Sequence, residues 1–220
     1  MARIGVIGGT GHLGKAIARR LAGAGHEVTL GSRTADKAAT VAGELAGDGV
    51  IVASGANAAI AAGQDVLIVT VPYAAQAATL AEIAPHIGEA ILVDTTVPLV
   101  PPRVMRVQLP AAGSAALEAK ALLGEGVRFV TAFHSVAAHI LDTDARVDCD
   151  VLVFSDDVEA RNVVIGLAQD MALRGLSGGA LANSAAAEAL TSILIYMNKT
   201  YGADGAGIRF TGLAKAPPIA

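Results

Sequence analysis

Short apolar runs alternate along the chain with longer alanine-rich segments, and this alternation predicts a repeated strand–helix pattern. The runs are rich in β-branched residues and largely uninterrupted by polar positions, which is typical of strands buried on both faces of a sheet. We expect strands at residues 3–7, 27–31, 50–53, 66–71, 90–94, 128–133 and 150–154. Segments of helix-forming composition lie between them, at residues 13–25, 34–47, 74–87 and 114–124. The order predicts an α/β fold, a Rossmann-like doubly wound and mostly parallel sheet covered by helices.

The pattern changes after the seventh predicted strand. Asp156 and Glu159 have the spacing of a helix cap and predict a helix over residues 157–173. We then expect a glycine- and serine-rich turn at residues 174–184 and a last helix over residues 185–201. An irregular tail should follow at residues 207–220, with its last residues disordered. The sequence therefore predicts a Rossmann-like nucleotide-binding domain over residues 1–155 and a small C-terminal helical part over residues 156–220.

Composition limits the classes of protein to which the chain can belong. Of 220 residues, 53% are hydrophobic and only 16% are charged, which indicates a large buried core. The mean hydropathy is positive, at +0.55, yet no apolar run approaches the roughly 20 residues of a membrane-spanning helix. The net charge of −4 is too small to suggest binding to nucleic acid or a membrane surface, and the single cysteine, Cys149, fits a reducing compartment. We expect a soluble cytoplasmic protein.

A glycine-rich motif follows the first predicted strand directly and opens a predicted helix. Residues 9–14 read GTGHLG, a G-x-G-x-x-G pattern. In this interpretation Gly9 permits the tight turn, Gly11 lets the backbone approach a pyrophosphate, and Gly14 lets the helix pack closely on the sheet. The N-terminus of the helix supplies amide donors and a favourable dipole. The motif and its position predict a dinucleotide site.

The end of the second predicted strand indicates which dinucleotide is bound. Sites that prefer NAD usually carry an acidic residue there, which bonds the ribose hydroxyls. This chain has Gly31-Ser32-Arg33 instead, with Lys37 one helical turn later. Ser32 can donate a hydrogen bond to a 2′-phosphate, and Arg33 and Lys37 can pair with its charge, so we expect NADP. The alternative is that both cations form a solvated face and that Ser32 or Thr34 caps the helix.

No side chain has the surroundings of an obvious catalytic group. The sequence holds no Ser/His/Asp arrangement, metal-ligand spacing or close carboxylate pair that would define a site, and we read Asp148-Cys149-Asp150 as turn residues around a buried thiol. Pro72 and Tyr73 follow the fourth predicted strand, where they can either flank a cofactor or pack in a stiff turn.

Several segments together resemble the F420-dependent NADP oxidoreductases. The resemblance runs from Arg3 to about Phe210. It is carried by residues 5–33, which include the glycine motif and Gly-Ser-Arg, and by VLIVTVPYAAQ (66–76), VDTTVPLVP (93–101), TAFHSVAAHIL (131–141) and LANSAAAEALTSILIYMNKTYGADGAGIRF (181–210).

This resemblance implies a reversible hydride exchange between NADPH and the deazaflavin coenzyme F420, performed by a homodimer. It implies that NADP is bound by Gly9, Thr10, Gly11, His12, Leu13, Ser32, Arg33 and Lys37, with further contacts from Tyr73, Ala77, Leu99 and Ala138. The deazaflavin would lie against Val97, His134 and Val136, in a site completed by the C-terminal part. Such an exchange needs no catalytic side chain, because the cofactors carry the chemistry. His134 either bonds the deazaflavin ring or is a structural histidine at a strand end.

Two other functions fit an NADP site. One is an NADP-dependent reductase of a small imine or carbonyl substrate, which requires a proton donor such as His134 or Tyr73. The other is a non-catalytic NADP-binding redox sensor.

Overall fold

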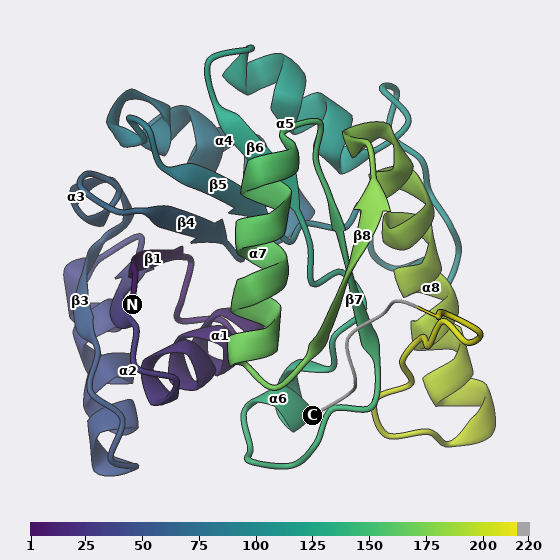
Figure 1. The fold of residues 1–220 in the computed structure, drawn as a ribbon, viewed down its shortest axis with the longest axis horizontal. Helices are drawn as coiled ribbons and strands as arrows, with labels where there is room; N and C mark the ends of the chain where they lie inside the picture. The colour runs from purple at the N-terminus through teal and green to yellow at the C-terminus, as the bar shows by residue number, and fades with distance from the viewer. Residues whose placement is uncertain (215–220) are drawn as a thin grey trace.

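The computed structural model describes residues 1–214, which form an eight-stranded sheet in the order β3-β2-β1-β4-β5-β6-β7-β8. Neighbouring strands are parallel except β6 and β7, which are antiparallel and share one residue pair. The strands are β1 (Arg3–Ile7), β2 (Glu27–Ser32), β3 (Ala53–Ala56), β4 (Val66–Val69), β5 (Ile91–Asp94), β6 (Arg128–Thr131), β7 (Asp150–Phe154) and β8 (Arg174–Gly179). The predicted Rossmann-like, mostly parallel sheet is confirmed (Figure 1).

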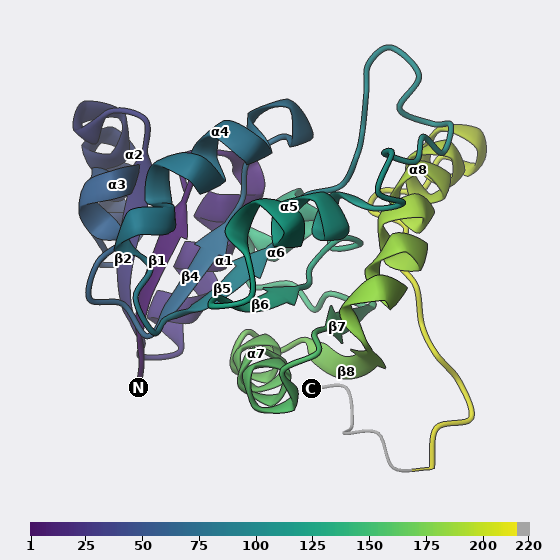
Figure 2. The same cartoon turned by 90° about the horizontal axis from the view of Figure 1, so that it is seen from above.

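Helices cover both faces of the sheet and make a three-layer structure (Figure 2). They are α1 (His12–Gly23), α2 (Ala35–Gly47), α3 (Asn57–Ile60), α4 (Tyr73–Ile83), α5 (Ala115–Leu123), α6 (Ala138–Leu141), α7 (Val158–Asp170) and α8 (Ser184–Tyr201), with single 3₁₀ turns at Ala84–His86 and Leu181–Asn183. Side chains of α1, α2 and α7 share one buried cluster with the sheet. Side chains of α3, α4 and α5 share the other.

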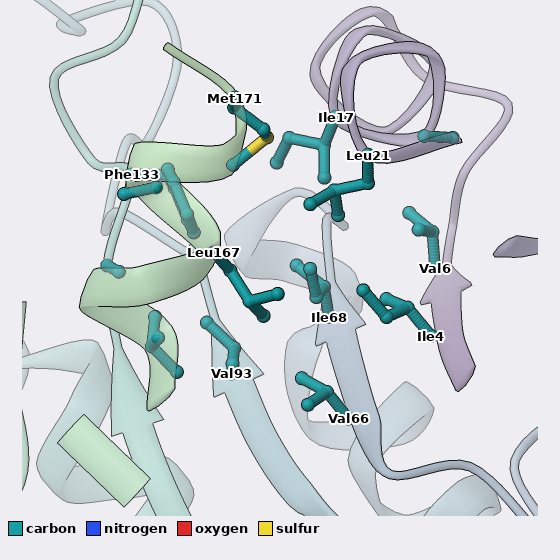
Figure 3. Close-up of a cluster of buried hydrophobic side chains, with 14 of the residues drawn as sticks. Ile4, Val6, Ile17, Leu21, Val66, Ile68, Val93, Phe133, Leu167 and Met171 are labelled. Atoms are coloured by element: carbon teal, nitrogen blue, oxygen red, sulfur yellow. The ribbon is translucent and has the colours of Figure 1, made fainter. Parts of the chain in front are cut away.

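The alternation of side chains along β1 and β4 divides the core between these two faces. Ile4 and Val6 on β1 and Ile68 on β4 belong to the cluster between the sheet and α1 and α7, which also contains Ile17, Leu21 and Leu167 (Figure 3). Such side chains are fully buried, and each contributes about 1.5–3 kcal/mol relative to an exposed position.

Three local predictions were wrong. The third strand lies three residues later than expected, at Ala53–Ala56. The predicted glycine-rich turn at 174–184 begins instead with β8, which pairs in parallel with β7. The cap of α7 is Asp157, whose side chain accepts from the N–H of Ala160 at 2.9 Å, whereas Asp156 accepts from the N–H of Leu181.

The predicted domain division after residue 155 falls between β7 and α7. Because β8 returns to the same sheet, the sheet continues past this point. Residues 207–214 of the tail form neither helix nor strand, as expected, and the expectation for residues 215–220 lies outside the described residues. Of the helices described, none is both long and apolar enough to cross a membrane.

The last helix rises past the carboxyl end of the parallel strands. At its start, Ser184 Oγ accepts a hydrogen bond of 2.9 Å from Thr131 at the end of β6. Two turns later, Thr191 Oγ1 donates to the carbonyl oxygen of His134, in the loop that follows β6. Helix α8 therefore lies beside the loops that leave this edge of the sheet, and Figure 2 shows the long loop between β5 and α5 next to it.

Candidate functional site

The glycine loop lies between β1 and α1, next to the point where the strand order changes direction between β1 and β4. Gly8, one residue before the motif, has a φ of 72°, in the left-handed region. The conformational freedom assigned to Gly9 is therefore needed at Gly8, which corrects the prediction. Gly9 is needed for space, because a Cβ there would lie 2.8 Å from Leu30 Cγ and 2.9 Å from the carbonyl oxygen of Val6.

Of the two other motif glycines, Gly14 has the surroundings that the prediction requires, while the predicted role of Gly11 toward a pyrophosphate stays a prediction. A Cβ on Gly14 would lie 2.5 Å from Thr70 Oγ1 and 2.6 Å from Gly9 Cα, so only glycine lets α1 approach so closely. A Cβ on Gly11 would lie 3.6 Å from the carbonyl oxygen of Gly8 and 4.0 Å from that of Thr70, which are ordinary contact distances, so packing within the protein does not require glycine there. Gly11 is also the N-cap of α1, and among residues 1–214 no side-chain cap bonds the first amides of this helix, which have no partner within the helix.

The end of β2 brings a buried hydroxyl and two cations to the same loop. Ser32 is 4% exposed and its Oγ lies 3.4 Å from Thr10 Oγ1. Arg33 and Lys37 are exposed, and no salt bridge among residues 1–214 involves either of them. Thr34 is the N-cap of α2 but its side chain makes no capping bond. The arrangement offers unpaired positive charge beside hydroxyl donors.

Thr10, Ser32 and Arg33 line a cleft of about 340 Å³, whereas the predicted Lys37 lies outside its lining. Its walls come from the glycine loop, the end of β2, and the segment after β4, and consist of Gly8, Thr10, Gly11, Ser32, Arg33, Asn57, Thr70, Val71, Pro72, Ala75 and Thr79. Asn57 and Thr70 are not among the site residues predicted from the sequence. Asn57 is 2% exposed and accepts from the N–H of Gly8 at 3.1 Å, which fixes the start of the loop.

Two of the predicted motif residues lie on α1 outside the lining of this cleft. His12 is the exposed first residue of the helix, and Leu13 packs in part against the buried cluster under α1. From these positions, the side chains of His12 and Leu13 can contact a molecule bound at the N-terminus of α1 only from the edge of the cleft.

Tyr73 and Ala77 do not line the glycine-loop cleft. They face α5 on the other side of α4, around a separate pocket of about 250 Å³. Tyr73 Oη donates to Glu118 Oε2 at 2.7 Å, and burial together with this carboxylate raises the pKa of Tyr73 to about 12. The structure therefore does not bring these two predicted cofactor contacts together with the glycine loop, and places Pro72, Ala75 and Thr79 there instead.

The remaining predicted residues lie on loops that leave adjacent strands. Val97 and Leu99 follow β5, while His134, Val136 and Ala138 follow β6, and the pair Asp94 and Thr131 shows that both strands end at the same level. All but His134 are partly exposed at this edge of the sheet. The edge thus presents small and apolar side chains next to the glycine-loop cleft.

His134 is buried, and the backbone of the residue before it is strained. Phe133 before it has a φ of 64°, a conformation that costs a bulky residue about 1–3 kcal/mol, while its ring is buried in the core. His134 is 7% exposed, and among the described residues its Nε2 has no hydrogen-bond partner. Burial lowers the pKa of His134 to about 4, so the ring is neutral at pH 7.

The thiol of Cys149 is buried, as the sequence predicted, and burial raises its pKa to about 11. Across residues 1–214, no group of three or more His, Cys, Asp or Glu side chains could hold a metal ion. The polar groups around the cleft are hydroxyl donors and cations suited to a phosphorylated dinucleotide, and the imidazole of His134 is buried and neutral.

Comparisons with known proteins agree with this assignment. Residues 3–98 match the family model described as NADP oxidoreductase, coenzyme F420-dependent. The chain is 38% identical over 221 residues to the F420-dependent NADP reductase of Methanothermobacter thermautotrophicus, covering 96% of this chain and 95% of the relative. It is 35% identical to the reductase of the same name from Methanocaldococcus jannaschii, covering 96% and 99%. The crystal structure of a candidate F420-dependent NADP-reductase from Arthrobacter sp. FB24 superimposes with a TM-score of 0.84 at 23% identity, covering 96% of this chain and all of the other, and supports the fold.

Proposed function

Because the chain belongs to the family of F420-dependent NADP reductases, we propose that it transfers a hydride reversibly between NADPH and the deazaflavin coenzyme F420. The observation that carries this proposal is the identity of 38% over nearly the full length of a reductase with that name. The cleft at the glycine loop, which is lined by the cation Arg33, supports the NADP half of the reaction.

The NADP half of the proposed site has a donor for each anionic part of the cofactor. The open amides at the start of α1 would bind the pyrophosphate, where the helix dipole favours negative charge. Ser32, Arg33 and Lys37 would hold the 2′-phosphate, with Thr10 beside Ser32. Pro72 and Ala75 would line the groove in place of Tyr73 and Ala77.

The second coenzyme would lie at the edge formed by the loops after β5 and β6, against Val97, His134 and Val136. When both coenzymes are bound, they supply the chemistry, in which one hydride leaves NADPH and one proton is taken up as the deazaflavin is reduced. The protein then has to hold two flat rings with their reacting carbons about 3–3.5 Å apart, and small side chains such as Val97 and Ala138 permit this approach.

The proposed role of His134 follows from its neutral imidazole and unpartnered Nε2. A neutral imidazole can donate a hydrogen bond from one ring nitrogen or accept one at the other without introducing charge. In this role His134 orients the deazaflavin, and C-terminal helix α8 completes the site by holding its carbonyl oxygen.

The proposal is tested by mixing the purified protein with NADPH and oxidised F420 and following the loss of the visible absorbance of the deazaflavin. We expect turnover in both directions as the ratio of NADPH to NADP is changed. A protein that binds NADPH, as shown by titration, but leaves F420 oxidised would refute the proposal and favour a redox sensor. Oxidation of NADPH by a small cyclic imine, without F420, would favour the imine-reductase alternative.

We also propose that the protein forms a homodimer through α8. Four large apolar side chains on this helix are exposed, with similar ones on the loop between β5 and α5; they are Ile193, Tyr196, Met197 and Tyr201, and Val100, Met105, Val107 and Leu109. Apolar patches of this kind mark interaction surfaces. Sedimentation equilibrium tests the proposal, since M197E should shift a dimer to monomers.

The single, buried cysteine suits a reducing compartment such as the cytoplasm.

A further inference from the structure

Two buried carboxylates hold the two ends of the long β5–α5 loop, which we define as residues 95–114. The loop contains no helix or strand and includes Val97 and Leu99. Between its ends it is held mainly by local bonds, such as those from the Gln108 amide to the carbonyl oxygens of Val100 and Arg103. One long bond, from Ser192 Oγ on α8 to the carbonyl oxygen of Arg106 at 3.5 Å, also reaches it, so its position beside α8 depends mainly on how its ends are held.

Asp94 holds the first end. This residue ends β5, is 1% exposed, and its Oδ1 accepts from the N–H of Thr96 at 3.0 Å and from Thr96 Oγ1 at 2.6 Å. Its other oxygen accepts a close hydrogen bond from the amide of Gln76 on α4. The same amide also reaches the carbonyl oxygen of Ala115 at 3.4 Å, which links the first end of the loop to the second.

Glu188 holds the second end from a different part of the chain. It lies on α8 and is 2% exposed. Its carboxylate accepts from the N–H groups of Ala115 at 2.7 Å and Ala116 at 3.1 Å, and from Ser184 Oγ at 2.9 Å. The first amides of a helix have no partner within the helix, so Glu188 caps α5 from 72 residues or more away in sequence.

The same helix also holds the turn that carries His134. Thr191 lies three residues after Glu188, on the same side of α8, and its Oγ1 donates to the carbonyl oxygen of His134 at 2.8 Å. One rigid helix thus ties together the loop with Val97 and the loop with His134.

We propose that Glu188 is a positioning residue for the second coenzyme. Through α5 and α8 it fixes the distance between the β5–α5 loop and the His134 turn, between which the flat ring of the deazaflavin lies. The inference rests on the proposed function, and it assigns Glu188 a role in binding F420 and none in binding NADPH. Glu188 does not touch the reacting atoms.

The test compares E188Q with a matched control, D157N. An amide at position 188 places a donor against the N–H donors of α5 and removes one acceptor. D157N weakens the cap of α7, and also the ion pair of Asp157 with Arg128 at the start of β6, on a helix that packs away from the β5–α5 loop. Steady-state kinetics give KM for each coenzyme, titration gives the Kd of NADPH, and hydrogen exchange reports on the amides of Ala115 and Ala116.

For E188Q we expect KM for F420 to rise roughly tenfold while the Kd of NADPH changes less than twofold, with faster exchange at Ala115 and Ala116. D157N should lower Tm without changing either KM. T191V, which removes only the hydroxyl bonded to His134, should also raise KM for F420, by about threefold. This second variant decides the question if E188Q does not fold.

The inference is overturned if exchange at Ala115 and Ala116 accelerates while KM for F420 stays constant, or if both coenzymes lose affinity equally. Unchanged KM for F420 in T191V, with E188Q unfolded, overturns it as well. Failure of the proposed function is a distinct result, since it appears in the unaltered protein as NADPH binding without reduction of F420.

Discussion

Replacement of Arg33 by alanine should weaken NADPH binding selectively. Arg33 follows β2 at the rim of the glycine-loop cleft, and it is exposed. Because no salt bridge within residues 1–214 involves Arg33, its removal leaves no protein carboxylate without a partner. The fold should therefore be unaffected, and any loss of affinity should report on the ligand alone.

The size of the loss follows from the kind of interaction. A hydrogen bond between charged groups contributes about 1.5–3 kcal/mol, which corresponds to roughly 10- to 150-fold in Kd. An exposed guanidinium is screened by solvent and salt, so we expect the lower end, about tenfold at 0.1 M salt. NADH lacks the 2′-phosphate, and its Kd should change less than twofold.

Calorimetric titration of both nucleotides measures this selectivity. The matched control is R146A, which removes the same charge from an exposed arginine in the loop after α6. That loop contacts the far end of α1, since Ala145 accepts from Arg20 in the last turn of the helix. Equal weakening of NADPH and NADH by R33A, or an equal effect of R146A, would refute the assignment of Arg33 to the 2′-phosphate.

Three further predictions test other parts of the structure. G14A should lower the free energy of unfolding by about 1–3 kcal/mol in urea, because its Cβ would lie 2.5 Å from Thr70 Oγ1; an unchanged midpoint would contradict this contact. Y73F should change the Kd of NADPH less than twofold, since Tyr73 bonds Glu118 outside the cleft, and a tenfold loss would return Tyr73 to the cofactor. The pKa of His134, lowered to about 4 by burial, makes the unfolded chain bind more protons between pH 6.5 and 4. The free energy of unfolding should therefore be fully present above pH 6.5 and should decrease as the pH is lowered, by about 2 kcal/mol from pH 7.5 to pH 5. H134N should remove that part of the pH dependence.

The repeated strand–helix pattern was sufficient to predict the sheet, but β8 could not be found in this manner. Its sequence, RGLSGG, contains three glycines and reads as a turn. The strand forms because β7 supplies a partner, and glycine is required there: a Cβ on Gly178 would lie 2.1 Å from the ring of Phe154. The glycines that made this segment resemble a turn are the residues that permit its close packing against Phe154.

The residues of the candidate site also divide into those that could be predicted from the sequence and those that could not. Gly11, Ser32 and Arg33 were found because their motif is local in sequence and its spacing has a direct physical reason. Asn57 and Glu188 were missed because each bonds backbone amides that lie 49 or more residues away. Tyr73 was assigned to the cofactor by the family resemblance, while its position after β4 left its role open, and the structure turns its side chain toward α5.

The placement of α8 has a consequence for the order in which the chain matures during synthesis. The glycine-loop cleft is lined by residues between Gly8 and Thr79, so it can close once the first parallel strands have been made. The β5–α5 loop and the His134 turn obtain their bonds to Glu188 and Thr191 only after the last helix has left the ribosome. A nascent chain would therefore acquire its dinucleotide cleft early and the fixed geometry of its second ligand site last.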